Sequence, residues 1–324
     1  MRLRAFPDAV RMELAIETRG LTRRFNGAHG VDGLALEVPA GAVYGFLGPN
    51  GAGKTTTIRL LLGLLAPDRG DVVLQGRPLA TDRLGALAQV GALVESPSLY
   101  PHLSGRQNLE VTRRLIDAPR TRIDEVLDVT GMRDSAERRV REYSLGMKQR
   151  LAISLALLGA PRLVILDEPG NGLDPAGIQD MRTLLRRLAD TLGITVFVSS
   201  HQLAEVQQVA SHVGVLHQGR LRFQGSLPDL LATCASPLHV RCDDPPRAAA
   251  LLERAGARID RIDADGLSAK ADSCSDGDLN RVLVEAGIAV RHLARAQPSL
   301  EAFFFDVTRA DVNRVDVSRA EAIA

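Results

Sequence analysis

The sequence predicts an α/β core followed by a smaller α+β domain, and three observations support this. Apolar runs of strand length alternate with helical patterns over residues 12–235. One of these runs leads directly into a glycine-rich loop and then into a helix. The composition changes near residues 235–237, and a βαββαβ pattern follows. We therefore expect an Arg-rich lead over 1–11, a core over 12–235 and an accessory domain over 236–324.

Length and composition narrow the class of protein. A chain of 324 residues, 45% hydrophobic, can bury one large core and one smaller core. The net charge of +1 argues against a general nucleic-acid binder. The three Cys lack C-x-x-C spacing, so neither a disulfide framework nor a zinc site is expected. The first residues lack the apolar core of a signal peptide, and no run of 18 apolar residues occurs. We expect a cytoplasmic protein.

The glycine-rich loop fits the pattern G-x-x-x-x-G-K-[ST]. A buried strand over 42–47 precedes it, and a helix begins near Thr56. In this context backbone N–H groups and the helix N-terminus bind phosphate, Lys54 reaches the β- and γ-phosphates, and the Thr55 hydroxyl binds Mg²⁺. Only three of the 40 basic residues are Lys, so a Lys here is hard to ascribe to chance. The loop consists of Gly48, Pro49, Asn50, Gly51, Ala52, Gly53, Lys54 and Thr55.

Two further strands end in polar groups. The apolar run 163–166 ends at Asp167 and Glu168, where Asp167 suits Mg²⁺ and Glu168 suits a general base for water. The alternative is two solvated acids at a strand end. The strand over 194–198 is followed by His201, which we interpret as a phosphate contact. A lone His at a strand end is more often a surface residue or a satisfied core group.

The pattern predicts the remaining elements of the core as follows. Ser144 precedes a helix over 148–158, where its hydroxyl and Gly146 form either a second anion site or a simple N-cap. Asp174 is expected at an N-cap with Pro at the first helical position. The other expected elements are β-type segments over 14–39, strands over 71–74 and 91–95, helices over 84–90, 104–117 and 124–130, and a hairpin over 213–223.

The accessory domain is expected to form a small ferredoxin-like sandwich with an added helix. Its elements are predicted to be a strand over 238–242, a helix over 245–255, a hairpin over 259–269, a helix over 279–286, a strand over 288–293 and a last helix over 299–307.

Taken together, these segments resemble the ATP-binding subunit of an ABC transporter over about residues 13–230. They follow the family's order: Walker A at 48–55, Q-loop at 95, signature at 143–147, Walker B at 163–168, D-loop at 171–174 and the H-loop at His201. The resemblance implies a P-loop NTPase core with a β-subdomain and a helical subdomain over about 96–158. It also implies an ATPase that uses ATP and Mg²⁺.

The resemblance assigns a role to each matching residue. Glu168 and His201 would be catalytic, Asp174 would belong to the D-loop, and Thr55, Asp167 and Glu95 would bind the metal. Phe25 would stack on adenine, although an aromatic at this place is more often a half-buried strand residue. The other ATP-binding residues would be the loop 48–55, Thr56 and Glu95, and the signature acting on the partner's nucleotide would be Ser144, Leu145, Gly146 and Met147.

Two departures from the family pattern refine the resemblance. The common LSGGQ signature appears here as Tyr-Ser-Leu-Gly-Met, and the Q-loop Gln is Glu95. Both changes are similar to the ABC-2 exporter subgroup that includes bacitracin and lantibiotic resistance ATPases. Such subunits form head-to-tail homodimers or heterodimers on the inner face of the membrane and bind a separate permease. Export of a drug or antimicrobial peptide is therefore expected, with no nucleic-acid partner.

Two other classes of protein fit the sequence less well. A soluble ABC ATPase acting in translation or DNA repair usually joins two ATPase units or inserts long coiled coils, and neither is present. A P-loop kinase or GTPase would need neither the signature nor His201.

Overall fold

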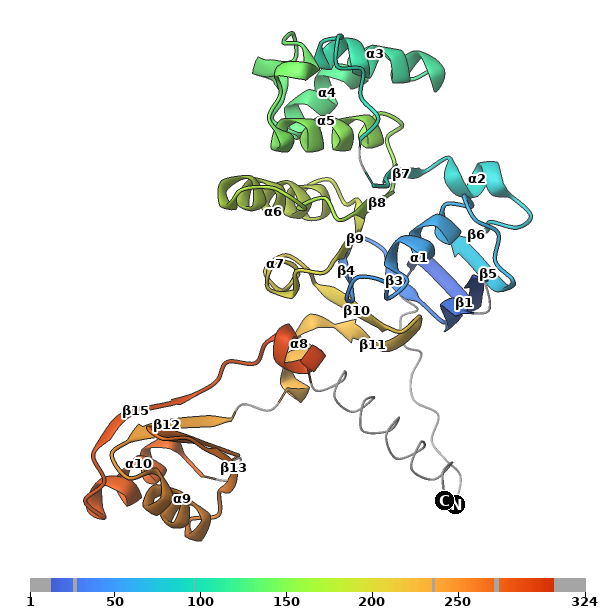
Figure 1. The fold of residues 1–324 in the computed structure, drawn as a ribbon. Helices are drawn as coiled ribbons and strands as arrows, with labels where there is room; N and C mark the ends of the chain where they lie inside the picture. The colour runs from blue at the N-terminus through green and yellow to red at the C-terminus, as the bar shows by residue number, and fades with distance from the viewer. Residues whose placement is uncertain (1–12, 26–27, 96, 235–236, 271–273, 306–324) are drawn as a thin grey trace. The chain divides into compact units, whose positions relative to one another are not determined.

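The computed structural model describes residues 13–25, 28–95, 97–234, 237–270 and 274–305. Among these residues the chain forms two compact units, one ending at Leu227 and one beginning at Pro228 (Figure 1). The predicted lead over 1–11 lies outside the described residues.

A six-stranded sheet forms the centre of the first unit. Its order is β11-β10-β4-β9-β8-β7, and all neighbours are parallel except the edge strand β11. The strands are β4 (Val43–Leu47), β7 (Val90–Leu93), β8 (Leu163–Asp167), β9 (Thr195–Ser200), β10 (His212–His217) and β11 (Arg220–Ser226).

Both faces of this sheet are buried. In β8 the alternate residues Leu163 and Ile165 pack into one apolar cluster, while Val164 and Leu166 pack into the other. Successive side chains of a strand point to opposite faces, so a strand covered on both sides is apolar throughout. This explains the unbroken apolar run of the sequence.

A second, antiparallel sheet packs with the helix that follows the glycine-rich loop. Its order is β2-β1-β5-β6, with β3 paired to β1. Ile58 and Leu61 of that helix share an apolar cluster with Leu21 and Val31 of the sheet. The elements are β1 (Leu14–Phe25), β2 (Ala28–Leu34), β3 (Glu37–Pro39), α1 (Lys54–Leu61), β5 (Arg69–Leu74), β6 (Arg77–Pro78) and α2 (Arg83–Leu87).

Three helices lie together in the segment predicted to be a helical subdomain (Figure 1). A capping box begins the first: Ser104 Oγ accepts from Gln107 N, and the Gln107 side chain accepts from Ser104 N. Thr130 and Ser154 join the other two through a buried hydroxyl pair at 2.7 Å. The helices are α3 (Gly105–Leu115), α4 (Thr121–Val129) and α5 (Leu145–Leu157), with short 3₁₀ turns η1 (Arg133–Ser135) and η2 (Val140–Glu142).

Two more helices follow the strands that carry polar groups. Asp174 caps α6 (Pro175–Asp190) by accepting from Gly177 N at 2.9 Å. The short α7 (Leu203–Gln207) follows β9.

The second unit contains a four-stranded antiparallel sheet of order β13-β14-β12-β15. The helices α9 and α10 pack into a core with alternate strand residues such as Leu238 and Val240. The elements are α8 (Leu227–Thr233), β12 (Leu238–Cys242), α9 (Pro245–Arg254), β13 (Arg258–Ile262), β14 (Gly266–Lys270), α10 (Asp276–Glu285) and β15 (Val290–Arg295). Residues 300–305 are helical, and the end of the predicted last helix lies outside the described residues.

Several predicted boundaries are wrong. The helix expected over 84–90 ends at Leu87, and Val90 begins a strand. Helix α5 starts at Leu145 rather than at 148, because the Ser144 cap places it there. Helix α7 was not predicted, since five residues are too short to show a helical period. The strand over 91–95 ends at Leu93, so Glu95 lies in the loop beyond it. Within the described parts of the chain, no helix has the length and apolarity needed to cross a membrane.

Candidate functional site

The glycine-rich loop joins β4 to α1, and two of its glycines are fixed by close approach of other backbone. A Cβ on Gly53 would lie 2.3 Å from the carbonyl oxygen of Gly30, and Gly53 has a φ of 108°. A Cβ on Gly48 would lie 2.4 Å from the carbonyl oxygen of Leu216. Any other residue would force these neighbours apart, so the loop stays thin and its N–H groups can face an anion.

Lys54 lies inside the loop with a side chain that is only 6% exposed. Its Nζ donates to the carbonyl oxygens of Gly48 at 2.8 Å and Pro49 at 3.3 Å, and lies 3.2 Å from Glu168 Oε1. All three partners are oxygen atoms that accept hydrogen bonds, and the oxygens of a phosphate accept hydrogen bonds in the same way. A bound phosphate can therefore replace them without leaving the buried ammonium unpaired.

Asp167 contacts Thr55, one of the two other residues predicted to bind the metal. Thr55 Oγ1 donates to Asp167 Oδ2 at 3.0 Å, and Ser199 Oγ donates to Asp167 Oδ1 at 2.6 Å. The Asp167 side chain is buried. A hydroxyl and a carboxylate in contact fit Mg²⁺, which takes hard oxygen ligands and shares them with phosphate oxygens.

Glu168 adopts a left-handed backbone with φ of 51°. Its N–H donates to Ser199 O at 3.2 Å and Ser199 Oγ at 3.0 Å, which offsets the cost of this conformation. Its carboxylate lies between two basic groups, with Lys54 near Oε1 and His201 Nδ1 hydrogen-bonded to Oε2. With this left-handed backbone conformation, the carboxylate of Glu168 lies beside Lys54 of the phosphate loop.

Ser199 is a site residue that the sequence reasoning missed. It is fully buried, and its hydroxyl links Asp167 to the backbone of Glu168. The sequence shows a Ser hydroxyl at the end of β9, which could have suggested a site residue. Only the pairing of β9 with β8 shows that this hydroxyl lies beside Asp167.

Glu95 has a φ of 59° and pairs with Arg59 of α1. It also lines a cavity of about 560 Å³ together with Asp167 and Glu168. The cavity is lined by Asn50, Thr55, Glu95, Pro97, Leu145, Gln149, Asp167, Glu168, Asn171 and His201. The structure therefore gathers residues from five separated segments around one space.

The signature segment rests on the D-loop of the same chain. Leu145 Cδ2 lies so near Gly172 that a Cβ there would approach it to 3.0 Å, and Gly146 faces Leu173. Ser144 Oγ accepts from Met147 N at 3.3 Å, so the hydroxyl acts as an N-cap in this structure. Ser144 and Leu145 are both exposed, which leaves the helix start open to an external anion.

Phe25 lies at the exposed end of β1 with 43% of its surface accessible. Its ring packs over Gly30, and the Arg23 guanidinium lies 5.4 Å from the ring centroid. The Gly30 carbonyl in turn contacts Gly53, so the ring is one residue removed from the phosphate loop. Stacking on adenine stays a prediction.

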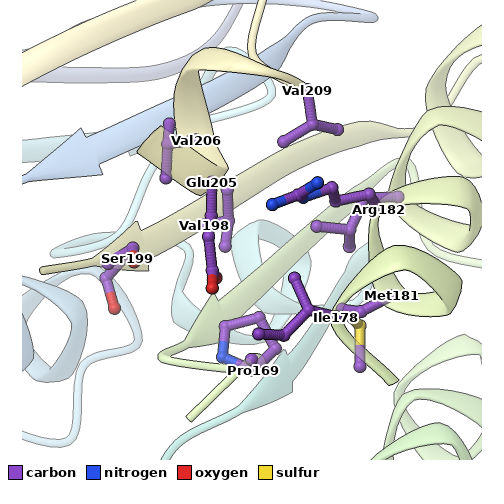
Figure 2. Close-up of a pocket in the computed structure, with 12 residues that line it drawn as sticks. Pro169, Ile178, Met181, Arg182, Val198, Ser199, Glu205, Val206 and Val209 are labelled. Atoms are coloured by element: carbon purple, nitrogen blue, oxygen red, sulfur yellow. The ribbon is translucent and has the colours of Figure 1, made fainter. Parts of the chain in front are cut away.

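A small hollow of about 30 Å³ lies among α6, β9 and α7 (Figure 2). Glu205 of α7 and Arg182 of α6 both face it, together with Pro169 and apolar side chains from α6 and β9. Burial raises the pKa of Glu205, and the charges of Arg182 and His201 offset part of this effect. A Cβ on Gly170 would lie 3.2 Å from Glu205 Oε2, so α7 is in contact with the segment that follows Glu168.

Comparison with known proteins identifies the family. The family model described as ABC transporter matches residues 31–171. The chain is 40% identical to the bacitracin transport ATP-binding protein BcrA of Bacillus licheniformis, over 90% of this chain and 97% of that protein. It is 36% identical to the daunorubicin/doxorubicin resistance ATP-binding protein DrrA of Streptomyces peucetius, over 91% and 92%.

Solved structures show the same fold. The cbiO1 structure from Clostridium perfringens, part of the ABC transporter complex cbiONQ, is 28% identical with a TM-score of 0.63, covering 68% of this chain and 92% of that one. The ATP-binding cassette MJ0796, in a dimeric post-hydrolysis state bound to ADP and Pi, has a TM-score of 0.58 at 22% identity, covering 65% and 98%. The phosphate loop, the paired acids and these similarities agree: the chain belongs to the ATP-binding subunits of the ABC transporter family, which hydrolyse ATP to power transport.

Proposed function

We propose that this subunit powers the export of a drug or antimicrobial peptide through a separate membrane permease. It would act as a head-to-tail pair of ATPase subunits at the cytoplasmic face of the membrane, with ATP and Mg²⁺. The observation that supports this best is that two separate helix starts of one chain are suited to binding phosphate. One is the loop around Lys54, and the other is the exposed start of α5 at Ser144.

The arrangement of Lys54, Glu168 and His201 supports a hydrolytic role. When phosphate oxygens replace the Lys54 partners, the ammonium leaves Glu168, and the carboxylate becomes free to accept a proton from water. His201, bonded to the other carboxylate oxygen, holds Glu168 in place and can donate to the γ-phosphate. When bound by Thr55 and Asp167, Mg²⁺ would neutralise charge that develops on the phosphates.

The export assignment rests on the relatives. BcrA is a bacitracin transport ATP-binding protein and DrrA a daunorubicin/doxorubicin resistance protein, and both are matched over nearly their whole length. The lantibiotic transport ATP-binding protein SrtF of Streptococcus pyogenes is 38% identical over 57% of this chain and 80% of its own. The names of these relatives point to peptide antibiotics and anthracyclines, so the proposed cargo is an antimicrobial compound of one of these two kinds.

Mixing two inactive variants tests the head-to-tail arrangement. Lys54→Ala removes the phosphate contact, and Ser144→Arg blocks the α5 start; each variant alone should have nearly no ATPase activity. In a mixed dimer, the intact loop of one chain meets the intact signature of the other, so activity should partly return. Lys270→Ala, in the second unit, is the control and should match the unmodified chain. No activity in the mixture would contradict the composite site.

Affinity purification from membranes tests the role in transport. The tagged chain should co-purify with a protein that has several membrane spans. Cells that express the chain and this partner should tolerate more peptide antibiotic or anthracycline than cells in which the chain carries Lys54→Ala. Co-sedimentation with ribosomes and no membrane partner would favour the soluble alternative.

A further inference from the structure

One acidic residue, Asp68, holds the end of β1. Asp68 lies directly before β5, and its N–H donates to the carbonyl oxygen of Thr22 at 2.9 Å. Its carboxylate accepts hydrogen bonds from the backbone N–H of Arg24 and from the guanidinium of Arg23, each at 2.8 Å. Asp68 thus contacts three successive residues of β1, and the next residue of the strand is Phe25.

These contacts give the Arg23 guanidinium a defined position. The hydrogen bond from the Arg24 N–H, and then the charge and the hydrogen bond of Arg23, lower the pKa of the Asp68 carboxyl, so it is ionised at neutral pH. An ion pair between partly exposed side chains stabilises little by itself, because both side chains must be ordered to form it. Here two backbone hydrogen bonds already fix Asp68 on β1, so only the Arg23 side chain has to be ordered.

The Arg23 guanidinium in turn lies over the ring of Phe25, with its Cζ 5.4 Å from the ring centroid. One edge of the ring packs on Gly30, where a Cβ would lie 2.7 Å from Phe25 Cε2. The ring is still 43% exposed although Arg23 covers one face, which leaves the opposite face for a ligand. Gly30 also contacts Gly53 of the phosphate loop, so the ring and the loop are held together.

We propose that Arg23 and Asp68 are positioning residues for the nucleobase: Asp68 holds the guanidinium against one face of Phe25, and adenine stacks on the other face. The inference rests on the predicted stacking of Phe25 and depends on neither the dimer nor the permease. A Phe side chain loses rotamer freedom when a ligand orders it, and this loss weakens binding. A ring that is already held by a cation–π contact and by Gly30 loses less of this freedom.

Equilibrium binding of ATP and of ribose 5′-triphosphate, which lacks only the base, tests the proposal in the full chain. The metal is chelated so that neither ligand is hydrolysed. Asp68→Ala should weaken ATP binding roughly two- to fivefold, the range of an exposed cation–π contact, and leave ribose triphosphate binding unchanged, which also shows that the variant is folded. Equal weakening for both ligands, or no change, would overturn the proposal. Tighter ATP binding would also overturn it, since Arg23 would then compete with the base.

Phe25→Ala separates the positioning role from stacking itself. It should weaken ATP binding, and adding Asp68→Ala to it should have no further effect, because no ring is left to hold. If Phe25→Ala alone leaves ATP binding unchanged, stacking is absent and the proposal fails with it. If Phe25→Ala weakens ATP binding and Asp68→Ala does not, only the positioning role is refuted.

Asp82→Ala is the matched control. Asp82 also accepts from a guanidinium, that of Arg77 at 2.9 Å, and from a backbone N–H, that of Gly85 at 3.0 Å, but it lies at the start of α2. This variant should leave the ratio of the two affinities unchanged. A fall in ATP binding equal to that of Asp68→Ala would mean that loss of any such ion pair has this effect, and would overturn the proposal. Failure of the mixing experiment with Lys54→Ala would refute the composite site without altering these results.

Discussion

At the residue scale, the site depends on single side chains that bridge strands. Ser199 accepts from Glu168 N and donates to Asp167, so one hydroxyl orients both acids. The left-handed backbone of Glu168 makes this support necessary, because a side chain with a Cβ holds such a conformation only when its surroundings favour it. The positions of Asp167 and Glu168 therefore depend on both β8 and β9.

We predict that Ser199→Ala lowers both activity and stability. The buried Asp167 loses a donor and Glu168 N loses an acceptor, which should cost about 1–3 kcal/mol in the free energy of unfolding. If a similar free energy is lost from positioning of the acids, the ATPase rate falls roughly tenfold. Chemical denaturation and steady-state ATPase assays measure the two effects.

The neighbouring Ser200→Ala is the control for this prediction. Within the part of the chain that the structure describes, its Oγ accepts only from Gln202 N, at 2.9 Å, in the first turn after the strand. It should change the rate less than twofold, within the small effects of most substitutions away from such networks. Equal rates for the two alanine variants would contradict the role of Ser199.

At the element scale, α7 connects His201 to the segment after Glu168. Glu205 reaches from this helix to Gly170, within the hollow that Arg182 also faces (Figure 2). A helix of five residues has little stability of its own, so its position depends on these contacts. Charge on Glu205 therefore affects how firmly the segments on both sides of the site are held.

We predict that Glu205→Gln stabilises the protein increasingly as pH rises. Burial raises the pKa of Glu205, so the folded state favours the protonated carboxyl. The resulting stability is present below the ordinary pKa of a Glu and is lost as pH rises through the raised value, whereas Gln keeps it throughout. The melting temperature of the variant should match the unmodified protein in acid and exceed it at pH 8.

Glu37→Gln replaces an exposed acid of the same unit and serves as the control. It should show no such growing difference. A Glu205→Gln variant that is less stable at pH 8 than the unmodified protein would mean that the carboxylate is paired rather than desolvated.

At the scale of the whole molecule, the two units have separate apolar cores and are expected to unfold separately. The core of the first unit contains Tyr44, stacked on Phe197 with ring centroids 5.6 Å apart. The Tyr44 hydroxyl is buried and has no partner among the described residues, and burial raises its pKa far above the ordinary value. The unpaired hydroxyl of Tyr44 therefore lowers the stability of this core.

We predict that Tyr44→Phe stabilises the first unit by about 1 kcal/mol, since it removes an unpaired buried hydroxyl and keeps the ring. The transition of that unit should move up by about 2–4 °C in calorimetry, and that of the second unit should not move. Tyr143→Phe is the matched comparison: its hydroxyl donates to Ser135 O at 2.5 Å, so its loss should lower the same transition. A fall for Tyr44→Phe would contradict the prediction.

Elements with a local sequence signal were predicted correctly, and elements without one were not. The buried strands β4 and β8 and the capped helix α3 were expected, because their signals are local: an unbroken apolar run or a cap at fixed spacing. In the second unit, the elements follow the expected order, with β12 at the predicted bounds. The sequence did not predict helix α7 or the loop position of Glu95, because short segments take their conformation from their neighbours.

The sequence by itself determined the phosphate loop and the two acids, because each depends on residues adjacent in the chain. It also determined the family, because these short motifs follow one another in the family's order. Only the tertiary structure decided the contacts of Ser199 with Asp167, of Arg59 with Glu95, and of Gln149 with the cavity that Asp167 and Glu168 line. The first two pairs are 32 and 36 residues apart. No local pattern encodes such contacts, since they arise from strand order and helix packing, and these also select which buried polar groups find partners.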